Sequence, residues 1–559
     1  NVTVALSAPA QISPTNDTVC NGGSTTLTAS GGTTTATATY QWGTGTVGNN
    51  IIPNENGASI TVSPTVNTTY WVRRISACGT ATAAITKTIT LGSTVAGTLS
   101  TIPTSICKGT KPKDIVLSGQ IGSVIKWQTA TNAAFTTDVI DINSTATTLT
   151  SAMLTAINVT TYYRAVVQNG NCSIEYTAPL EITIPATAIY QNGVWSSTPT
   201  EATSVIILSD ITLTENLHVC SCEVTNNAVM TIGVGQNLVV VNSLIVDPSS
   251  NIIVEDQGSI VQISDDAVDI GKITVKRKTT PMKNYDFSYW SSPVLNNTLF
   301  DLSPLTRYDK YYSYDPIIDN YVTHLNGAAV MEPGLGYLLR APLDWSVTNE
   351  FGGKYEGTFR GIPNNGLVAV PFKKGAGTYN LIGNPYPSAI DIDLFLTDPN
   401  NINLVNGTIY LWTHNTAISS TIPGNAVYNY SADDYAKYNL TGGVQSASAA
   451  ITGGRKPDGK VASGQSFFIE TKTGLANGNY TVNFRNYMRV VGHNDTFYKA
   501  GGPIANVPTI EKNRLWINVS NTQGAYNEIL LGYITGATNE FDNLYDGYIM
   551  DGGGAILLY

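Results

Sequence analysis

Charged side chains are scarce in this chain. Asp, Glu, Lys and Arg make up 13% of the 559 residues, and the net charge is −10, whereas soluble domains typically carry about 25% charged residues. A nucleic-acid-binding protein needs a clustered basic surface to neutralise phosphates. The one short basic run, residues 272–278 (KITVKRK), alternates as the exposed face of a strand does. We therefore expect no nucleic-acid partner.

A membrane-spanning run and a signal peptide are also missing. No apolar stretch approaches the ~18 residues that a helix needs to cross a bilayer, and the chain begins at Asn1 without a basic and apolar leader. We expect a mature product or a fragment. The last residues, 555–559 (AILLY), stop inside a predicted strand.

The patterns of common catalytic sites are absent too. There is no G-x-S-x-G elbow, and the histidines are scattered: His218, His324, His414 and His493. Residues 43–48 (GTGTVG) match G-x-G-x-x-G, but a loop pattern follows where a dinucleotide site needs a helix. We predict no catalytic residue, no cofactor and no enzymatic activity. The alternative is a hydrolase whose carboxylates pair only in space.

Two acidic groups are the remaining candidates for chemistry. Asp391 and Asp393 are predicted to lie on the polar face of an edge strand. Asp542, Asp546 and Asp551 stand in a Gly/Asn-rich segment, where oxygen ligands could hold calcium. Their spacing fits no established calcium loop, so we predict no metal site.

The residues that are abundant favour strands and turns. Hydrophobic residues reach 42%, enough to fill real cores, and the chain contains 51 Gly and 30 Tyr. Together with frequent Thr, Asn and Ser, this composition predicts an all-β fold.

Two units of similar pattern occupy the first 186 residues. Each contains a cysteine, a tryptophan, a pair of aromatic residues and a second cysteine: Cys20, Trp42, Tyr70, Trp71 and Cys78, then Cys107, Trp127, Tyr162, Tyr163 and Cys172. This order predicts tandem immunoglobulin-like sandwiches at residues 1–93 and 94–186. The even cysteine count suggests Cys20–Cys78 and Cys107–Cys172 disulfides in an oxidising compartment, with buried reduced thiols as the alternative.

Residues 187–278 form a run of short strands with Asn, Gly and Asp at the corners. The strands are predicted at residues 205–208, 211–214, 229–232, 238–241, 244–246, 252–254 and 259–263. Such spacing favours a short parallel β-solenoid, in which each coil buries its apolar face on the next. An antiparallel sandwich is the alternative.

The remaining residues are rich in aromatic side chains. Within forty residues stand Tyr285, Tyr289, Trp290, Tyr308, Tyr311, Tyr312, Tyr314 and Tyr321. Flat rings can stack on sugars, but tyrosines also fill strand interiors with the hydroxyl at a wet edge, and we favour packing. We predict a β-rich surface module at residues 279–504. Residues 505–559 are predicted to start a further β-sandwich.

Several unusual strings occur in a fixed order in this part of the chain. They are GNPYPSAID (383–391), GTIYLWTHN (407–415), DDYAKYNLTGG (433–443), GQSFFIE (464–470), FRNYMRV (484–490) and LLGYITGATNEFD (530–542). Over roughly residues 187–559 the chain thereby resembles a recurrent module of large surface proteins that gliding, Flavobacterium-like Bacteroidetes export by the type IX secretion system. The resemblance implies an extracellular or outer-membrane-surface location. It also implies the type IX translocon and its outer-membrane shuttle as partners, and a C-terminal sorting domain before which the β-sandwich at residues 505–559 is truncated.

The resemblance also implies two modification sites. Related surface modules often show a C-x-C at the place of Cys220 and Cys222, which favours a disulfide staple there; free thiols and a metal or redox site are the alternatives. Asp17-Thr18-Val19 resembles the acceptor that Bacteroidetes use for O-glycosylation, which makes Thr18 a candidate site.

Together these observations predict a non-enzymatic secreted or cell-surface protein. We expect an adhesin or a gliding-motility-associated component, with surface glycans or other surface proteins as candidate partners. The alternative is a carbohydrate-binding module of a larger secreted polysaccharide-degrading protein.

Overall fold

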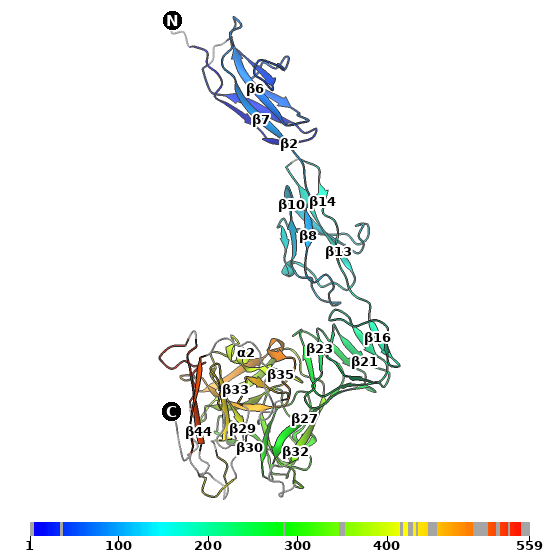
Figure 1. Ribbon diagram of the computed structural model, residues 1–559, viewed down its shortest axis with the longest axis vertical. Helices are drawn as coiled ribbons and strands as arrows, with labels where there is room; N and C mark the ends of the chain where they lie inside the picture. Colours follow the sequence, from blue (N-terminus) through cyan, green and yellow to red (C-terminus); the bar gives the residue numbers. More distant parts are fainter. Residues whose placement is uncertain are drawn as a thin grey trace. The chain divides into compact units, whose positions relative to one another are not determined.

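Strands make up nearly all of the regular structure, as the composition predicts. The computed structural model describes residues 5–33, 37–170, 172–282, 285–345, 353–413, 418–422, 429–431, 434–444, 456–495, 513–520, 526–534 and 537–548. Backbone contacts divide the chain into one unit of Asn1–Pro185 and a second of Ala186–Tyr559 (Figure 1). The division falls one residue from the predicted boundary at residues 186 and 187.

The first unit begins with a two-sheet sandwich. One sheet has the order β1(Gln11–Pro14), β3(Thr25–Ser30), β5(Ser59–Val62), and the other β2(Thr18–Cys20), β7(Ile85–Gly92), β6(Thr68–Ile75), β4(Thr39–Thr44). Between them Trp42 is fully buried, and its indole N–H donates to the Gly57 carbonyl at 3.0 Å. β2 runs parallel to β7 while the other pairs are antiparallel. This is the predicted immunoglobulin-like sandwich.

A second sandwich follows the same plan. One sheet contains β8(Thr98–Ser100), β9(Ile115–Ser118) and β12(Thr148–Leu149); the other contains β10(Ser123–Ala130), β11(Ile140–Ile142), β13(Thr161–Gln168), β14(Glu175–Tyr176) and β15(Leu180–Ile182). Trp127 occupies the place of Trp42. It is fully buried, and its indole donates to the Ala146 carbonyl at 3.0 Å.

The second unit opens with the predicted parallel solenoid. Three strands make up each coil: β18(Val205–Ile207), β19(Ile211–Leu213), β20(Leu217–Val219); then β21(Cys222–Val224), β22(Val229–Ile232), β23(Asn237–Val240); then β24(Leu244–Val246), β25(Asn251–Val254), β26(Ser259–Gln262). The coils stack in register, and Cys222 pairs with Leu244, Val229 with Asn251 and Asn237 with Ser259. Between the second and third coils the sequence offset is the same, 22 residues, in all three sheets. The antiparallel alternative is therefore wrong.

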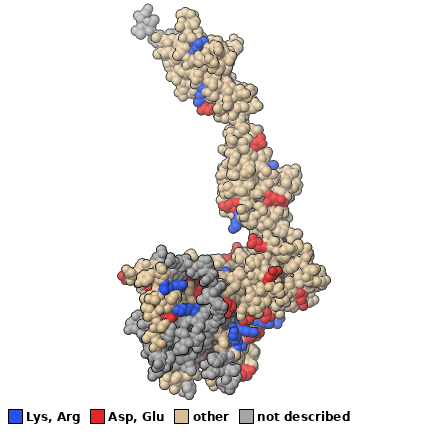
Figure 2. All heavy atoms as spheres, in the orientation of Figure 1, with Lys and Arg blue, Asp and Glu red and all other residues tan. Residues whose placement is uncertain are grey.

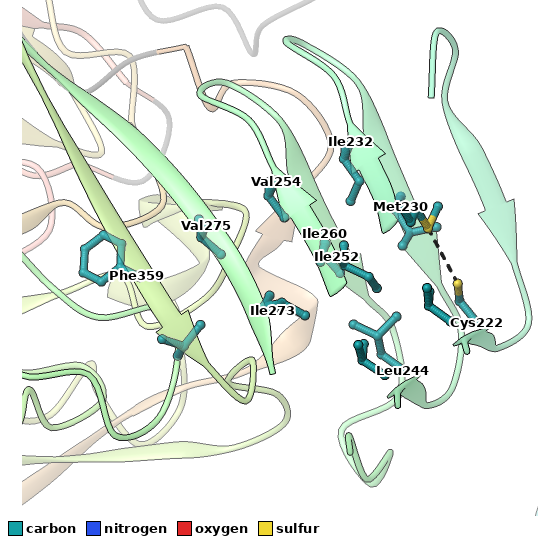
Figure 3. Close-up of a cluster of buried hydrophobic side chains, with 14 of the residues drawn as sticks. Cys222, Met230, Ile232, Leu244, Ile252, Val254, Ile260, Ile273, Val275 and Phe359 are labelled. Atoms are coloured by element: carbon teal, nitrogen blue, oxygen red, sulfur yellow. Dashed lines mark hydrogen bonds between the residues drawn. The ribbon is translucent and has the colours of Figure 1, made fainter. Parts of the chain in front are cut away.

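The solenoid core is a column of aliphatic side chains. Figure 3 shows this column, with Met230, Ile252 and Ile273 from successive coils drawn one beside the next. The column does not end at residue 278. β27(Ile273–Met282) runs parallel to β25 and then antiparallel to β32(Gly353–Gly361), and buried Phe359 on β32 belongs to the same cluster. The predicted boundary between residues 278 and 279 thus falls inside one strand of a continuous core.

Two further groups of strands complete the second unit. The sheet β28(Phe287–Trp290), β31(Tyr337–Arg340), β29(Tyr311–Asp315), β30(Asn320–Thr323) lies beside the solenoid core through Trp290 and Tyr311. The larger sheet has the order β34(Tyr379–Gly383), β40(Ser466–Thr471), β36(Val405–Trp412), β37(Tyr435–Asn439), β38(Gly442–Val444). A separate hairpin, β43(Arg514–Ser520) with β44(Tyr526–Gly532), is the last regular element described.

The GNPYP turn joins the solenoid to the larger sheet. Asn384 is fully buried and its side-chain amide donates to the carbonyls of Ser388 and Val461, at 2.7 and 3.0 Å. The Pro387 carbonyl accepts from the amide of Ile260 on β26 at 2.8 Å. The GNPYP turn is therefore an interior joint, and each position of β26 beside it is buried.

Two expectations about charged residues are wrong. Arg277 does not lie on an exposed face: it is 1% exposed, donates to the carbonyls of Ser463 and Asn494, and pairs with Asp256 at 3.2 Å. Asp391 and Asp393 do not share a strand face, because Asp391 caps α2(Ile392–Thr397) and Asp393 lies in its first turn. In both cases tertiary contacts outweigh the local alternation that the sequence shows.

Candidate functional site

The cysteines do not pair as predicted. Cys20 is bonded to Cys172 across 152 residues of sequence, which links the first sandwich to the second. Cys107 and Cys220 are each engaged in a disulfide as well, whereas Cys78 and Cys222 are free. Disulfides persist in oxidising environments, so the chain is a protein of the extracellular or secreted type.

Strand direction explains why the Cys20–Cys78 prediction is wrong. Cys20 ends β2 opposite Gly92, at the end of the sandwich where β6 begins. Cys78 follows β6 and lies at the other end. The eight residues of β6 span about 23 Å, whereas a disulfide needs Cα atoms within about 7 Å.

The same geometry separates Cys107 from Cys172. Thr110, next to Cys107, bridges to Ile157 just before β13, while Cys172 follows the far end of β13. The Cys220–Cys222 staple is also wrong. Cys222 points into the solenoid core, where its sulfur contacts the Met230 sulfur at 3.9 Å.

The Cys20–Cys172 bond sits within a hydrogen-bonded joint. The Thr94 hydroxyl donates to the Ser173 carbonyl at 2.7 Å. The oxygen of the same hydroxyl accepts from the Asn169 backbone amide at 3.1 Å. The Asn169 side chain donates to the Ser93 carbonyl at 3.1 Å. The residues between the two sandwiches are thus held by backbone and side-chain groups of the loop that carries Cys172.

Thiol labelling checks this assignment. We expect a maleimide at neutral pH to modify one thiol per native chain, because Cys78 is exposed while burial raises the pKa of Cys222 to about 12. Denaturation without reductant adds Cys222, and reduction exposes all six cysteines. Mass spectrometry of the labelled peptides reads out each step. A denatured, unreduced chain with no reactive thiol would support the three pairs that the sequence suggested.

Thr18 lies on β2 at the edge of the first sandwich. Its side chain is exposed, and its hydroxyl is 2.8 Å from the Thr90 hydroxyl on β7. The structure thus places this candidate acceptor on the surface within a strand and not in a loop. Its glycosylation stays a prediction.

The candidate catalytic and metal residues do not converge. His324 is half-buried, hydrogen-bonds to Ser313 at 2.8 Å and has a pKa lowered by burial. Among the residues that the structure describes, no three His, Cys, Asp or Glu side chains gather as a metal site requires. Asp546 accepts from the Asp542 amide at 2.7 Å, and Asp542 in turn accepts from Thr538. These carboxylates fold their own loop; His414 and Asp551 lie outside the described residues.

The aromatic residues divide into buried and exposed groups. Tyr289, Trp290 and Tyr311 are buried, and Tyr289 stacks on Trp412 with ring centroids 5.8 Å apart. Burial raises the pKa of Tyr289. Tyr285, Tyr308 and Tyr321 are exposed to between 43% and 57%. Packing therefore accounts for the central rings of this group.

A groove, which the sequence did not predict, lies beside the hairpin. It has a volume of about 640 Å³ and is lined by β37, β38, β44, Thr408 of β36 and residues of the loop 541–548. We call this the hairpin groove. Its volume is within the range of small-ligand sites, roughly 300–1,000 Å³. Sequence reasoning missed it because four separate segments supply its walls.

Specific contacts hold the walls of the hairpin groove. The loop is fixed to the sheet by the Gly407 amide, which donates to the Asn543 carbonyl at 2.7 Å, and by the Asn439 side chain, which donates to the Tyr545 carbonyl at 2.8 Å. The hairpin is fixed by Trp516, whose indole donates to the Gly443 carbonyl at 3.0 Å. The walls are therefore preformed.

An ion pair supports the hairpin wall. Glu528, with its side chain 4% exposed, lies 3.3 Å from the Lys456 ammonium. That ammonium is 4.0 Å from the centre of the Trp516 ring, and burial lowers its pKa although Glu528 opposes the shift. Trp516 thus contacts the sheet through its N–H and the Lys456 ammonium through its ring face.

The floor of the hairpin groove contains an unusual hydroxyl. Thr408 is 3% exposed, and its Oγ1 has no hydrogen-bond partner among the described residues. It follows Gly407, where the pairing of β36 with β40 shifts register between Val405 and Ile409. Such a bulge re-aims a side chain away from the ladder.

Comparison with known proteins identifies a family. A family model described as "Domain of unknown function (DUF8693)" matches residues 187–559, more than half of the chain. The chain belongs to the DUF8693 family. The DUF8693 region includes the solenoid and the hairpin groove, and a second model, "Domain of unknown function (DUF8696)", matches residues 95–186, the second sandwich. No curated protein sequence matches the chain.

The solved structures that match this DUF8693 protein do so with low TM-scores. Murine CEACAM1b matches at 13% identity and a TM-score of 0.18, over 31% of this chain and 98% of that one. The three N-terminal domains of the bacteriophage RB49 Highly Immunogenic Outer Capsid protein (Hoc) match at 10% identity and a TM-score of 0.22, over 64% and 97%. At these TM-scores the likeness carries no argument about function. No helix in the described part of the chain is long and apolar enough to cross a membrane.

Proposed function

We propose that this protein is a non-enzymatic secreted or cell-surface protein, exported by the type IX secretion system, that acts as an adhesin or a gliding-motility-associated surface component. The export route and the surface location rest on the ordered strings between residues 383 and 542. The adhesin role rests on the construction of the chain, in which a braced pair of sandwiches precedes a larger body with a preformed groove.

The observation that carries the proposal is the Cys20–Cys172 bond. It joins two sandwiches instead of bracing either one internally. In the chain-entropy model, a loop of this length stabilises the folded state by about 5 kcal/mol. More importantly for a surface protein, a covalent link across the joint restricts bending and separation of the two domains. An adhesin that transmits force to a bound surface needs such a spacer.

The surface composition supports the same role. Figure 2 shows sparse charged side chains on the face viewed, in keeping with the 13% charged residues of the chain. Exposed threonines line the first sandwich in cross-strand pairs, such as Thr26 with Thr61 at 3.1 Å and Thr69 with Thr88 at 2.8 Å. Contacts made by uncharged hydroxyl groups depend little on salt, because salt screens only charged groups.

Protease shaving of intact cells of the native host tests the location. We expect an externally added protease to remove the chain from wild-type cells while a periplasmic marker stays intact. In a strain that lacks the type IX translocon, the chain should accumulate inside and become protected. Equal protection in both strains would contradict the proposed export route.

A deletion strain tests the adhesin role. Loss of the gene should lower attachment to a solid surface or the speed of gliding, and expression of the wild-type chain should restore it. A deletion strain that attaches and glides as the parent does would contradict the role. The second candidate, a carbohydrate-binding module of a larger secreted protein, is favoured by one observation only, the hairpin groove.

A further inference from the structure

We propose that the hairpin groove binds a neutral oligosaccharide. The inference deepens the proposed function, on which it rests, by naming the class of ligand that the surface protein contacts. Three features of the groove carry it: an unpartnered buried hydroxyl on its floor, a pair of exposed aromatic rings on its wall, and balanced charge.

The hydroxyl of Thr408 points to a hydrogen-bonding ligand. A buried hydroxyl without a partner costs about 1–3 kcal/mol, so a folded protein rarely keeps one without a reason. Thr408 Oγ1 has no partner among the described residues, although it lines the groove. The position facing it is Gly547, where an added Cβ would lie 2.7 Å from that oxygen. The absence of a side chain at Gly547 thus leaves space beside this buried hydroxyl.

The aromatic pair supplies a flat apolar wall. Phe541 and Tyr548 stack on each other with ring centroids 4.6 Å apart, and they are 47% and 44% exposed. Both line the groove. The axial C–H faces of a pyranose ring pack against aromatic rings, while its equatorial hydroxyls point outward to polar groups. The aromatic rings of the groove can therefore contact the C–H face of a sugar, while the Thr408 hydroxyl can contact a hydroxyl of the same sugar.

The charge of the groove favours a neutral ligand. Lys437 of β37 lines it together with Asp546, and Glu528 is held by Lys456 at 3.3 Å. Positive and negative groups therefore balance. One carboxylate oxygen of Asp546, Oδ2, accepts from the Asp542 amide; the other, Oδ1, is suited to accept from a sugar hydroxyl. An anionic or cationic ligand would meet a like charge on one side of the groove.

A peptide strand is a poorer fit to the same groove. Strand addition requires free backbone groups on a sheet edge. β38 is the edge of its sheet, but its neighbouring carbonyls are occupied: Gly443 accepts from Trp516, and Thr441 accepts from Arg514 at 3.4 Å. The hairpin side chains thus close the edge that a peptide would use.

Calorimetric titration of the full chain tests the proposal. The probes are cellohexaose, xylohexaose and mannohexaose as neutral oligosaccharides and hexagalacturonate as an anionic one. We expect at least one neutral probe to bind and hexagalacturonate to fail. Thr408→Val, which replaces the hydroxyl by a methyl group of the same shape, should weaken binding at least tenfold. Because that hydroxyl has no partner within the described protein, the melting temperature should stay the same or rise.

Matched aromatic variants complete the test. Tyr548→Ala should weaken binding at least tenfold, while Tyr548→Phe should retain most of it. Tyr533→Ala removes an aromatic ring that is 79% exposed on the same hairpin but outside the groove, and it should leave binding unchanged. Binding by no neutral probe, binding only of hexagalacturonate, or equal affinity in Thr408→Val would each overturn the proposal. None of these outcomes affects the shaving and deletion experiments, so the two proposals fail separately.

Discussion

Pulled by its two ends, the oxidised chain will remain shorter than the reduced chain by about 500 Å. The bond between Cys20 and Cys172 encloses 152 residues of separation, and each residue contributes roughly 3.3–3.6 Å when extended. Force applied to the residues before Cys20 is transmitted through the disulfide directly to the residues after Cys172. The residues between them cannot be extended, whether or not their sandwiches unfold. Single-molecule force spectroscopy with and without a reductant measures the difference in contour length.

The control for this experiment is Cys78→Ser. Cys78 is a free, exposed thiol, so its replacement should change neither the oxidised nor the reduced length. The pairing that the sequence suggested makes a different prediction, because each bond would then enclose part of a single sandwich. Reduction would release two smaller lengths of about 200 Å each. Observation of two such releases would contradict the link between the sandwiches.

The mechanical consequence bears on the proposed role. An immunoglobulin-like sandwich without a covalent bypass extends when force unfolds it, and an extended spacer no longer holds its ligand-binding end at a fixed distance. With the bypass in place, the spacer between Cys20 and Cys172 keeps its length under load. The disulfide thus contributes a property that unfolding free energy alone does not describe.

Local patterns predicted the sandwiches well, and geometry explains why they did not predict the disulfides. Strands β3, β5 and β6 follow from alternation of apolar side chains, and buried Trp42 and Trp127 follow from their place in that pattern. Cysteine pairing depends instead on which end of a sandwich each cysteine occupies. That depends on the parallel pairing of β2 with β7, which no local signal reveals.

The buried charges show a second limit. The alternation in KITVKRK is real, and Lys276 and Lys278 do form ion pairs near the surface. Arg277 points the other way, toward residues 463 and 494, which are far away in the sequence. When one face of a strand packs on a core and the other face lies under a loop, the alternating sequence still predicts that the second face is exposed.

The hairpin groove shows a third limit. Asp542 and Asp546 belong to the acidic group that the sequence shows, and in the structure their carboxylates accept hydrogen bonds that shape the loop beside the groove. Thr408 stood inside a string that already marked the resemblance. The sequence does not indicate that Thr408 lies near Asp542 and Asp546, because the bulge that re-aims Thr408 forms only when β36 pairs with β40.

Replacement of Arg489 by methionine should destabilise the second unit by about 3–5 kcal/mol. Arg489 is 6% exposed, and its guanidinium donates to Ser388 Oγ at 3.1 Å, to the side-chain oxygens of Asn365 and Asn486 at 3.2 Å, and to the Ile260 carbonyl at 2.6 Å. Its charge lies 4.8 Å from the centre of the buried Tyr386 ring. Burial lowers the pKa of Arg489 to about 10, so it remains charged at neutral pH. Methionine fills similar volume but leaves these acceptors unpaired.

The control is Arg307→Met. Arg307 is half-exposed and pairs with Asp309 at 2.9 Å, and such surface pairs contribute about 0–1 kcal/mol. Arg489→Lys should fall between the two, because one ammonium cannot reach four acceptors that a planar guanidinium serves at once. Denaturant unfolding of the full chain measures all three variants. The transition of the tandem sandwiches should stay in place, since the four acceptors described for Arg489 all belong to the second unit.

Hydrogen exchange then separates a loss of local contacts from a loss of the whole unit. The amide of Ile260 donates to the Pro387 carbonyl, next to the carbonyl that Arg489 holds. If Arg489 locks the last solenoid coil to the GNPYP turn, exchange at β26 should accelerate in Arg489→Met more than exchange at Phe467 or Ile469 in the larger sheet. Equal acceleration at both places would mean that the coil and the sheet unfold together and that Arg489 stabilises a single cooperative body. Unchanged exchange at β26 would mean that the apolar column shown in Figure 3 holds the solenoid in place without the arginine.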